Sequence, residues 1–275
     1  PPARGQSSLK DKIFIGKLFL EKGFSVTALN NYLNCPWRYF YVNLLRLPKL
    51  KTNHQMYGTA VHAALRDFFN AWQTKPANKK FLMKRFEWHL AKEAFSKMEL
   101  KETLARGQKN LAGYYENRRP PWPPPRALHE FTVPALLLTP ALKLTGKLDK
   151  IEFIGSGNAV NVVDYKTGKP KTRGEIEGKT KNSAGDIKRQ LVFYNLLLNR
   201  HEKRKYQMVS GEIDFIEPDT SGRYRKEKFL IAPEEVSALE TLIHQVAAEI
   251  LELKFWEKNC NEKGCEFCRL RSFLS

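Results

Sequence analysis

The fold of this chain is decided by the stretch Ala159-Val160-Asn161-Val162-Val163-Asp164-Tyr165-Lys166. Its apolar first part predicts a buried strand, and the Gly- and Ser-rich residues 155–158 before it predict a turn. A second strand-like run, residues 142–148, precedes that turn and leads into Asp149. We therefore expect a hairpin. Because residues two apart in a strand face the same side, Asp164 and Lys166 point together and Tyr165 points away, and pairing across the hairpin can bring Asp149 beside them.

Two carboxylates and an ammonium group at one place are a costly way to build a core, but they suit a metal site. Carboxylate oxygens favour Mg²⁺ or Mn²⁺, and a metal held by Asp149 and Asp164 can bind a phosphate oxygen and activate a water. Lys166 can orient that water or stabilise the charge that develops at phosphorus. The alternative is a surface strand end with ordinary charges.

Two further candidates lie on predicted helices. His62 follows Gly58 on a helix of small and apolar residues. It is a packed core histidine or, if that helix abuts the sheet, a third metal ligand. Gln190 and Tyr194 are four residues apart and share one helix face. They contact a nucleotide or brace Lys166. The alternative is that Tyr194 packs in the core and Gln190 is an ordinary surface amide.

Four cysteines are present, and three of them lie close together near the C-terminus: Cys35, Cys260, Cys265 and Cys268. The last two form a C-x2-C ligand pair. The N-terminus has no features of a secretion signal, which favours metal or cluster ligation over disulfides. Four thiolates suit an iron–sulfur cluster or Zn²⁺ and would join the two ends of the chain. The alternative is a set of unligated thiols.

The charge of the chain favours a polyanionic partner. Its 275 residues include 47 Lys and Arg against 29 Asp and Glu, a formal net charge of +18. Nucleic acid is the first expectation and a membrane surface the alternative. No apolar run is long enough for a transmembrane helix. Many cations surround the predicted site, where they can bind the phosphates of a single strand or form a solvated loop; they are Lys166, Lys169, Lys171, Arg173, Lys179, Lys181, Lys188 and Arg189.

Helical patterns come first along the chain, then strands, then a helix, two strands and a long helix. This order predicts one α/β domain with an N-terminal helical subdomain. We expect a helix capped by Ser25 or Thr27, helices at 58–72, 79–97, 100–117, 187–199 and 233–256, and strands at 129–138, 142–153, 159–166, 207–216 and 225–231. Residues 1–24 are a basic lead-in, 120–125 a stiff proline-rich connector, and 169–186 a polar loop.

Taken together, these motifs resemble the PD-(D/E)xK nucleases of the RecB/AddB type, which include CRISPR adaptation nucleases and nuclease domains fused to UvrD-like helicases. The resemblance spans residues 25–268, and Glu130 lies where these proteins often carry an acidic residue on the first strand. The motifs occur in family order as Cys35-Pro36-Trp37, Gly58-Thr59-Ala60-Val61-His62, Gly146-Lys147-Leu148-Asp149, Val163-Asp164-Tyr165-Lys166-Thr167-Gly168 and Gln190-Leu191-Val192-Phe193-Tyr194. The resemblance implies a restriction-endonuclease-like α/β fold, in which helices flank a mixed central sheet, with a cysteine-stapled C-terminal tail.

The resemblance also implies a role for each matching residue. His62, Asp149 and Asp164 would bind the metal together with the backbone carbonyl of Tyr165. Lys166 would position the attacking water. Gln190 and Tyr194 would support the site or the DNA.

The four cysteines would hold a [4Fe–4S] cluster that is structural. Family members usually carry a further cysteine shortly after the C-x2-C pair, where this chain has Leu274. Either Cys260 takes the place of the fourth ligand with altered geometry, or the cluster is incomplete or replaced by Zn²⁺.

We therefore expect a Mg²⁺- or Mn²⁺-dependent deoxyribonuclease that acts on single-stranded DNA or DNA ends. The setting implied is the C-terminal nuclease domain of a helicase–nuclease in DNA repair or recombination, cytoplasmic or nucleoid-associated, without a membrane partner. The nuclease domain would comprise residues 25–275, with a helical part over 25–119, the catalytic sheet and helix over 127–232, and the C-terminal helix and cysteine tail over 233–275. The alternatives are a DNA-binding or channelling module of a repair complex and a stand-alone CRISPR adaptation nuclease.

Overall fold

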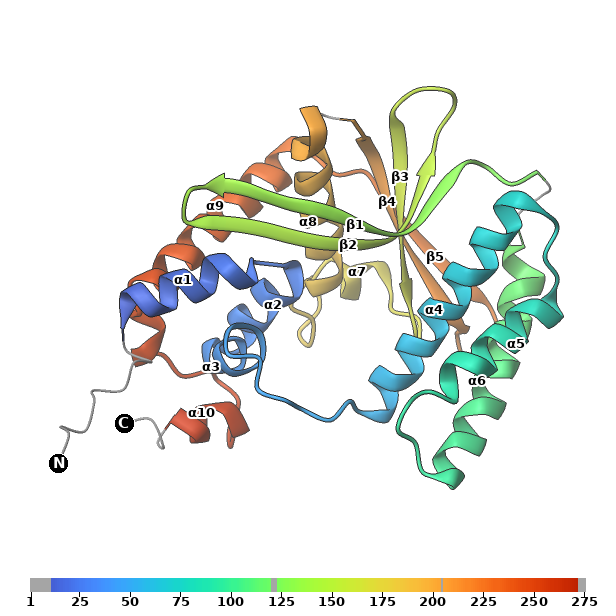
Figure 1. Ribbon diagram of the computed structural model, residues 1–275, viewed down its shortest axis with the longest axis horizontal. Helices are drawn as coiled ribbons and strands as arrows, with labels where there is room; N and C mark the ends of the chain where they lie inside the picture. The colour runs from blue at the N-terminus through green and yellow to red at the C-terminus, as the bar shows by residue number, and fades with distance from the viewer. Residues whose placement is uncertain (1–10, 120–122, 204, 272–275) are drawn as a thin grey trace.

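A computed structural model describes residues 11–119, 123–203 and 205–271. Five strands form one mixed sheet in the order β1-β2-β3-β4-β5, and helices lie on both of its faces (Figure 1). The strands are β1 (Ala127–Thr139), β2 (Leu142–Phe153), β3 (Ala159–Lys166), β4 (Gln207–Pro218) and β5 (Tyr224–Phe229).

The hairpin predicted around residues 155–158 is confirmed, because β2 and β3 pair antiparallel with Lys150 opposite Val163. This register places Asp149 next to Asp164 across the two strands. Strands β3 and β4 are parallel, and the chain connects them through α8 (Asp186–Arg200), as a parallel pair requires. The other neighbouring pairs, β1–β2 and β4–β5, are antiparallel.

Alternate residues of β3 face two separate helical groups. Val163 and Tyr165 pack with α4, α5 and α6, whereas Val160 and Val162 belong to the core beneath α8 and α9. The long helices α4–α6 form one body beside the sheet, and α1, α2, α8 and α9 lie on the other side (Figure 1). Their bounds are α1 (Lys12–Lys22), α2 (Val26–Asn34), α4 (Asn53–Thr74), α5 (Lys79–Leu90), α6 (Lys97–Arg118) and α9 (Pro233–Leu251).

Several short elements complete the described chain. Cys35 ends α2, and Pro36 at the first position of α3 starts a new turn, since proline lacks only an N–H that would be unsatisfied there. The short elements are α3 (Pro36–Tyr39), the π-helix η2 (Phe40–Leu44), α7 (Arg173–Ile176), the 3₁₀ helices η3 (His201–Lys203) and η4 (Lys254–Glu257), and α10 (Glu266–Leu270).

Some helix boundaries differ from the sequence expectation for identifiable reasons. The lead-in contains α1, capped by Asp11, and buries Ile15 and Phe19. Helix α4 begins before Gly58 because Thr52 and Gln55 form a capping box.

The predicted helix over 79–97 ends at Leu90, and Ser96 caps the next one. The long C-terminal helix ends at Leu251, because Leu253 adopts a left-handed backbone with φ of 61° that no α-helix continues. Pro120, Pro121 and Trp122 of the expected connector lie outside the described residues. Within the described part of the chain, no helix combines the length and apolar character needed to cross a membrane.

Candidate active site

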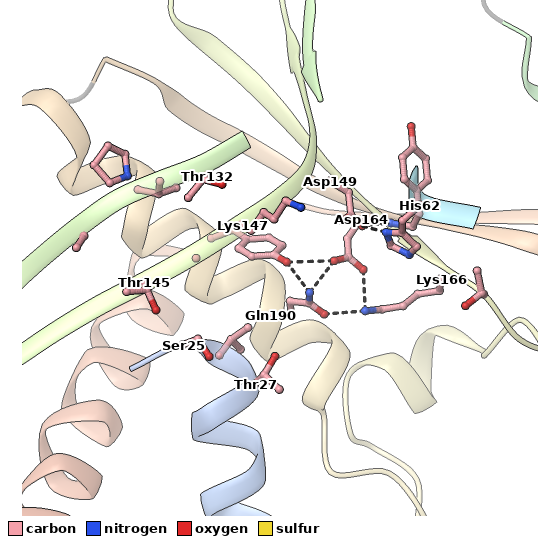
Figure 2. A pocket seen from close by; sticks show the side chains of 18 of the residues that line it. Ser25, Thr27, His62, Thr132, Thr145, Lys147, Asp149, Asp164, Lys166 and Gln190 are labelled. Atoms are coloured by element: carbon pink, nitrogen blue, oxygen red, sulfur yellow. Dashed lines mark hydrogen bonds and ion pairs between the residues drawn. The ribbon is translucent and has the colours of Figure 1, made fainter. Parts of the chain in front are cut away.

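A cavity of about 830 Å³ opens where β2 and β3 meet α8, α4 and the start of α2. Figure 2 shows its polar side chains converging from these elements. The residues predicted from the sequence that line it are His62, Asp149, Asp164, Tyr165, Lys166, Gln190 and Tyr194. The structure therefore brings together a predicted helix that precedes the sheet, two strands within it and the helix that connects β3 to β4.

Two glycines of the sequence motifs permit the close approach of these elements. A Cβ atom on Gly146 would lie 2.3 Å from Leu197 Cδ1, so a side chain at position 146 would force Leu197 to move from its place between β2 and α8. A Cβ atom on Gly58 would lie 3.1 Å from Thr167 Oγ1, which is also tight. Glycine thus sets the distance of α8 from β2 and of α4 from the end of β3.

Asp164 is at the centre of a hydrogen-bonded network with α8. Its Oδ1 accepts a hydrogen bond of 2.7 Å from Gln190 Nε2 and one of 3.3 Å from Tyr194 Oη. Gln190 Oε1 in turn accepts a hydrogen bond of 2.7 Å from Lys166 Nζ, which also lies 2.8 Å from Asp164 Oδ2 (Figure 2). Because Gln190 contacts both Asp164 and Lys166, it fixes the carboxylate and the ammonium relative to each other.

Burial governs the protonation chemistry of this network. Burial raises the pKa of Asp164; the charge of Lys166 opposes this rise and the charge of Asp149 adds to it, so that the pKa stays above its usual value. Burial, together with the charges of Asp164 and Asp149, raises the pKa of Tyr194 well above its usual range. Tyr194 therefore remains a neutral phenol, and its hydroxyl can donate a hydrogen bond to Asp164.

Asp149 connects the sheet to α4. Its Oδ2 accepts a hydrogen bond of 2.9 Å from the backbone N–H of Tyr165, and its Oδ1 lies 3.2 Å from His62 Nδ1. Burial lowers the pKa of His62, but the hydrogen bond and charge of Asp149 outweigh that effect and raise it. The ring of Tyr165 lies on the opposite side of β3, stacked parallel to Phe69 at 6.3 Å, as the strand alternation predicted.

Glu130 joins His62 and Asp149 in a group that can hold a metal ion, with ligand atoms all within 4.8 Å of one another. The backbone of Glu130 is left-handed, with φ of 54°, and the pairing of β1 with β2 skips from His129 to Phe131. Such strain in a residue other than glycine persists where the surroundings impose it, often at functional sites. The sequence indicated an acidic residue here, but it did not indicate that this carboxylate reaches His62.

The donor set fits a divalent cation. Oxygen-rich ligands with one imidazole suit Mg²⁺ or Mn²⁺. Asp164 Oδ2 is buried and, within the described residues, has no hydrogen-bond partner besides its ion pair with Lys166. The charge of Asp149 also disfavours the ionised form of Asp164. A cation between the two carboxylates removes both costs.

Sequence reasoning missed other polar residues that line the cavity. Ser25 and Thr27 come from the start of α2, and Lys147 from β2 forms an ion pair with Glu130. Ser25 was recognised only as a helix cap, which it is: its Oγ accepts a hydrogen bond from Ala28 N. The sequence signal that places Lys147 in the cavity was its position two residues before Asp149, within the Gly146–Asp149 motif.

The four cysteines come together at a second location, between the α2–α3 junction and the C-terminal tail. Sγ–Sγ separations are 3.8 Å for Cys35–Cys265, 3.7 Å for Cys35–Cys268 and 3.5 Å for Cys260–Cys268. No disulfide links them. Burial raises the pKa of Cys265, but hydrogen bonds from the backbone of Cys268 and neighbouring groups outweigh it and lower the pKa. The arrangement can hold a metal.

The predicted basic flank divides into paired and unpaired cations. Arg173, Lys179, Lys188 and Arg189 form ion pairs with acidic neighbours. Lys169 and Lys171 are exposed and, together with Lys109 of α6, line a second cavity of about 860 Å³. Among the described residues, none of these three lysines forms an ion pair.

Comparisons with known proteins agree with this geometry. A family model described as the PD-(D/E)XK nuclease superfamily matches residues 23–273. A solved structure from Eubacterium rectale, named "Putative exonuclease", aligns with a TM-score of 0.58 at 12% identity, covering 97% of this chain and 92% of that one. A second structure, SSO0001, aligns at 14% identity over 94% of both chains, with a TM-score of 0.33.

No curated protein matches the chain. The mixed five-stranded sheet with helices on both faces is the restriction-endonuclease-like α/β fold implied by the resemblance. The family model covers the sheet, both helical groups and the residues of the cavity. The chain therefore belongs to the PD-(D/E)XK nuclease superfamily.

Proposed function

We propose that this protein is a Mg²⁺- or Mn²⁺-dependent deoxyribonuclease that cleaves single-stranded DNA or DNA ends. The observation that carries the proposal is the contact between Asp164, Lys166 and Gln190, directly beside Asp149 and His62. A network of this kind would be costly as core packing, whereas it provides the groups that phosphodiester hydrolysis needs.

In the proposed mechanism, His62, Asp149, Asp164 and the backbone carbonyl of Tyr165 would hold the metal, which would supply Lewis-acid activation of the phosphate and of the attacking water. Lys166 orients the attacking water and offsets negative charge that develops on the phosphate oxygens. Gln190 holds Lys166 and Asp164 in place, and the hydroxyl of Tyr194 donates a hydrogen bond to Asp164 Oδ1.

A single DNA strand has a plausible route along the surface. Thr167 lines the active-site cavity, and Lys169, two residues later, lines the lysine-lined cavity. Their Cα atoms are at most about 7.6 Å apart, because each residue adds about 3.8 Å. A strand leaving the site can therefore place its next phosphates against the lysines, which supports a nucleic-acid substrate.

The test is cleavage of end-labelled single-stranded DNA with Mg²⁺ or Mn²⁺. We expect Asp164→Asn and Lys166→Met to lower the cleavage rate by about 10²- to 10³-fold or more, while DNA binding in a chelator is retained. Lys101→Ala, an exposed cation on α6, is the matched control and should cleave like the unchanged protein. Cleavage by Asp164→Asn at the unchanged rate contradicts the proposal.

We further propose that the domain is of the RecB/AddB type and works beside a helicase in DNA repair or recombination. The order of the motifs supports this subtype, and the surplus of cations supports a DNA partner. A helicase reading frame joined to this domain in its natural gene is the expected finding. A gene neighbourhood of CRISPR adaptation genes instead favours the stand-alone alternative, and binding without metal-dependent cleavage favours the channelling module.

A further inference from the structure

The cysteine group joins two distant parts of the described chain. Cys35 lies between α2 and α3, Cys260 follows η4, and Cys265 and Cys268 lie at the start of α10. Cys35 is separated from Cys265 by 230 residues and from Cys268 by 233. All four sulfur atoms lie within 4.8 Å of one another. Two of the cysteines are buried and two half-buried.

Three of the six sulfur–sulfur separations match those around one tetrahedral ion, and the other three are at most 4.8 Å. Four thiolates about 2.3 Å from a central Zn²⁺ stand about 3.8 Å apart along the edges of the tetrahedron. The three closest pairs here measure 3.8, 3.7 and 3.5 Å. The site therefore needs almost no rearrangement to hold a single ion.

A four-iron cluster does not fit the same geometry. Each of its irons binds a different thiolate, and the irons and sulfides of the cluster lie between the thiolates. Sulfur atoms separated by 3.5–3.8 Å are already close to van der Waals contact. Space for the cluster requires all four cysteines to move outward, against buried residues such as Trp37, which packs on Trp256 at 4.9 Å and donates a hydrogen bond to Lys258 O.

We propose that Cys35, Cys260, Cys265 and Cys268 bind one tetrahedral Zn²⁺, in place of the [4Fe–4S] cluster that the family resemblance implies. The proposal does not depend on the proposed nuclease activity. Four thiolates with no open position are typical of a structural zinc site. Zn²⁺ also binds such ligands more tightly than Fe²⁺ does.

The ion would act as a staple that maintains the wall of the active-site cavity. It would tie the C-terminal tail to the end of α2, and the beginning of α2 places Ser25 and Thr27 in the cavity. Bringing Cys35 and Cys265 together closes a loop of more than 200 residues, which costs conformational entropy. Zinc binding would offset that cost and so contribute directly to the stability of the fold.

The deciding measurement is the metal content of protein purified without oxygen from cells grown with added iron, so that a cluster can form and survive. We expect about one zinc per chain, little iron, and no visible absorption. A broad visible absorption band with several irons and acid-labile sulfide per chain overturns the proposal. So does one iron with visible bands, or a metal-free protein.

Substitutions test whether the bound zinc occupies the cysteine site. We expect Cys268→Ser to lose the zinc and to unfold at a lower temperature, whereas Asn261→Ala, an exposed change in the same loop, retains both properties. Retained stoichiometric zinc in Cys268→Ser contradicts the assignment.

If Cys268→Ser fails to fold, Co²⁺ exchanged into the unchanged protein gives the same information. Tetrahedral cobalt with four thiolates has intense visible and near-ultraviolet bands, and their absence also overturns the proposal. None of these readouts depends on DNA cleavage, so the zinc site and the nuclease proposal can fail separately.

Discussion

Asp164 shows how one residue is held ready by its surroundings. It is almost fully buried, and its Oδ1 accepts hydrogen bonds from Gln190 and Tyr194, whereas among the described residues Oδ2 has Lys166 as its only polar partner. Burying a carboxylate is costly unless it is paired, and one amine compensates only part of that cost. Asp164 therefore still favours a nearby positive charge, which is the physical reason why it is suited to act as a metal ligand.

Glu130 leads to a prediction at the same scale. Its carboxylate lies near His62 and Asp149 and is also paired with Lys147. If Glu130 is a ligand, Glu130→Gln should raise the Mg²⁺ concentration for half-maximal cleavage by about 10-fold or more. Removing a residue that only hydrogen-bonds to a metal ligand already lowers metal affinity by about 10-fold or more. The measurement is the cleavage rate over a Mg²⁺ series.

Lys147→Met is the control for this substitution, because it removes the ion pair and leaves the carboxylate. It should not raise the Mg²⁺ requirement. If both variants raise it equally, Glu130 acts through its ion pair with Lys147, and the ligand assignment is wrong.

At the scale of elements, the contact of α8 with β2 sets the geometry of the site. Gln190 and Tyr194 reach Asp164 because Gly146 lets Leu197 of α8 pack directly on the strand. Every residue of α8 from 191 to 198 is buried, so a shift of this helix is opposed by the core. A change at position 146 therefore affects both stability and the network of Asp164.

We predict that Gly146→Ala lowers the free energy of unfolding by about 1–3 kcal/mol, because its Cβ overlaps Leu197. Leu197→Ala alone should cost about 2–5 kcal/mol by leaving a cavity. The double variant should lose less than the sum, since the new methyl group occupies space that Leu197 vacates. Urea unfolding measures all three.

Gly157→Ala is the matched control, because nothing lies within 4 Å of a Cβ atom at that turn. Its unfolding free energy should change by less than about 0.5 kcal/mol. Strictly additive losses in the double variant contradict the proposed overlap.

At the scale of the whole molecule, a net charge of +18 is less informative than the distribution of unpaired cations. Many of the cations that the sequence placed near the site neutralise neighbouring acids, such as Arg173 with Glu177 and Glu227. Lys109, Lys169 and Lys171 remain exposed around the second cavity. Unpaired cations bind phosphates with the least competition, so the surface for DNA should be centred on them.

We predict that Lys109→Ala, Lys169→Ala and Lys171→Ala combined weaken binding of single-stranded DNA by about 10-fold or more and reduce the salt dependence by about 0.7 per lost phosphate contact. Fluorescence anisotropy in a chelator, at several salt concentrations, measures both. The control combines Lys79→Ala, Lys205→Ala and Lys254→Ala, which removes the same charge from lysines paired with acids elsewhere. Equal loss in both sets indicates a general charge effect and contradicts a defined path.

Much of the fold could be predicted because its signals are local. The apolar run before Asp164, the turn at 155–158 and the periodicity of residues 187–199 each depend on neighbouring residues, and the corresponding strands and helix are present. Helix ends were less predictable, because the cap at Thr52 and the left-handed Leu253 depend on single side chains and backbone strain. Helix α1 was missed because its apolar residues do not keep to one face: Ile15 and Phe19 are buried, whereas Ile13 is exposed.

The sequence by itself determined which chemical groups this protein carries and in what order: a carboxylate-lysine strand, a second carboxylate, a histidine, a Gln–Tyr helix and four cysteines. Only the tertiary structure decided which of them meet. It placed Glu130 beside His62, put Lys169 at the edge of a second cavity, and brought four sulfurs within 4.8 Å of one another. The physical reason is that strand alternation and helix periodicity fix the direction of a side chain locally, whereas its neighbours depend on long-range packing between elements.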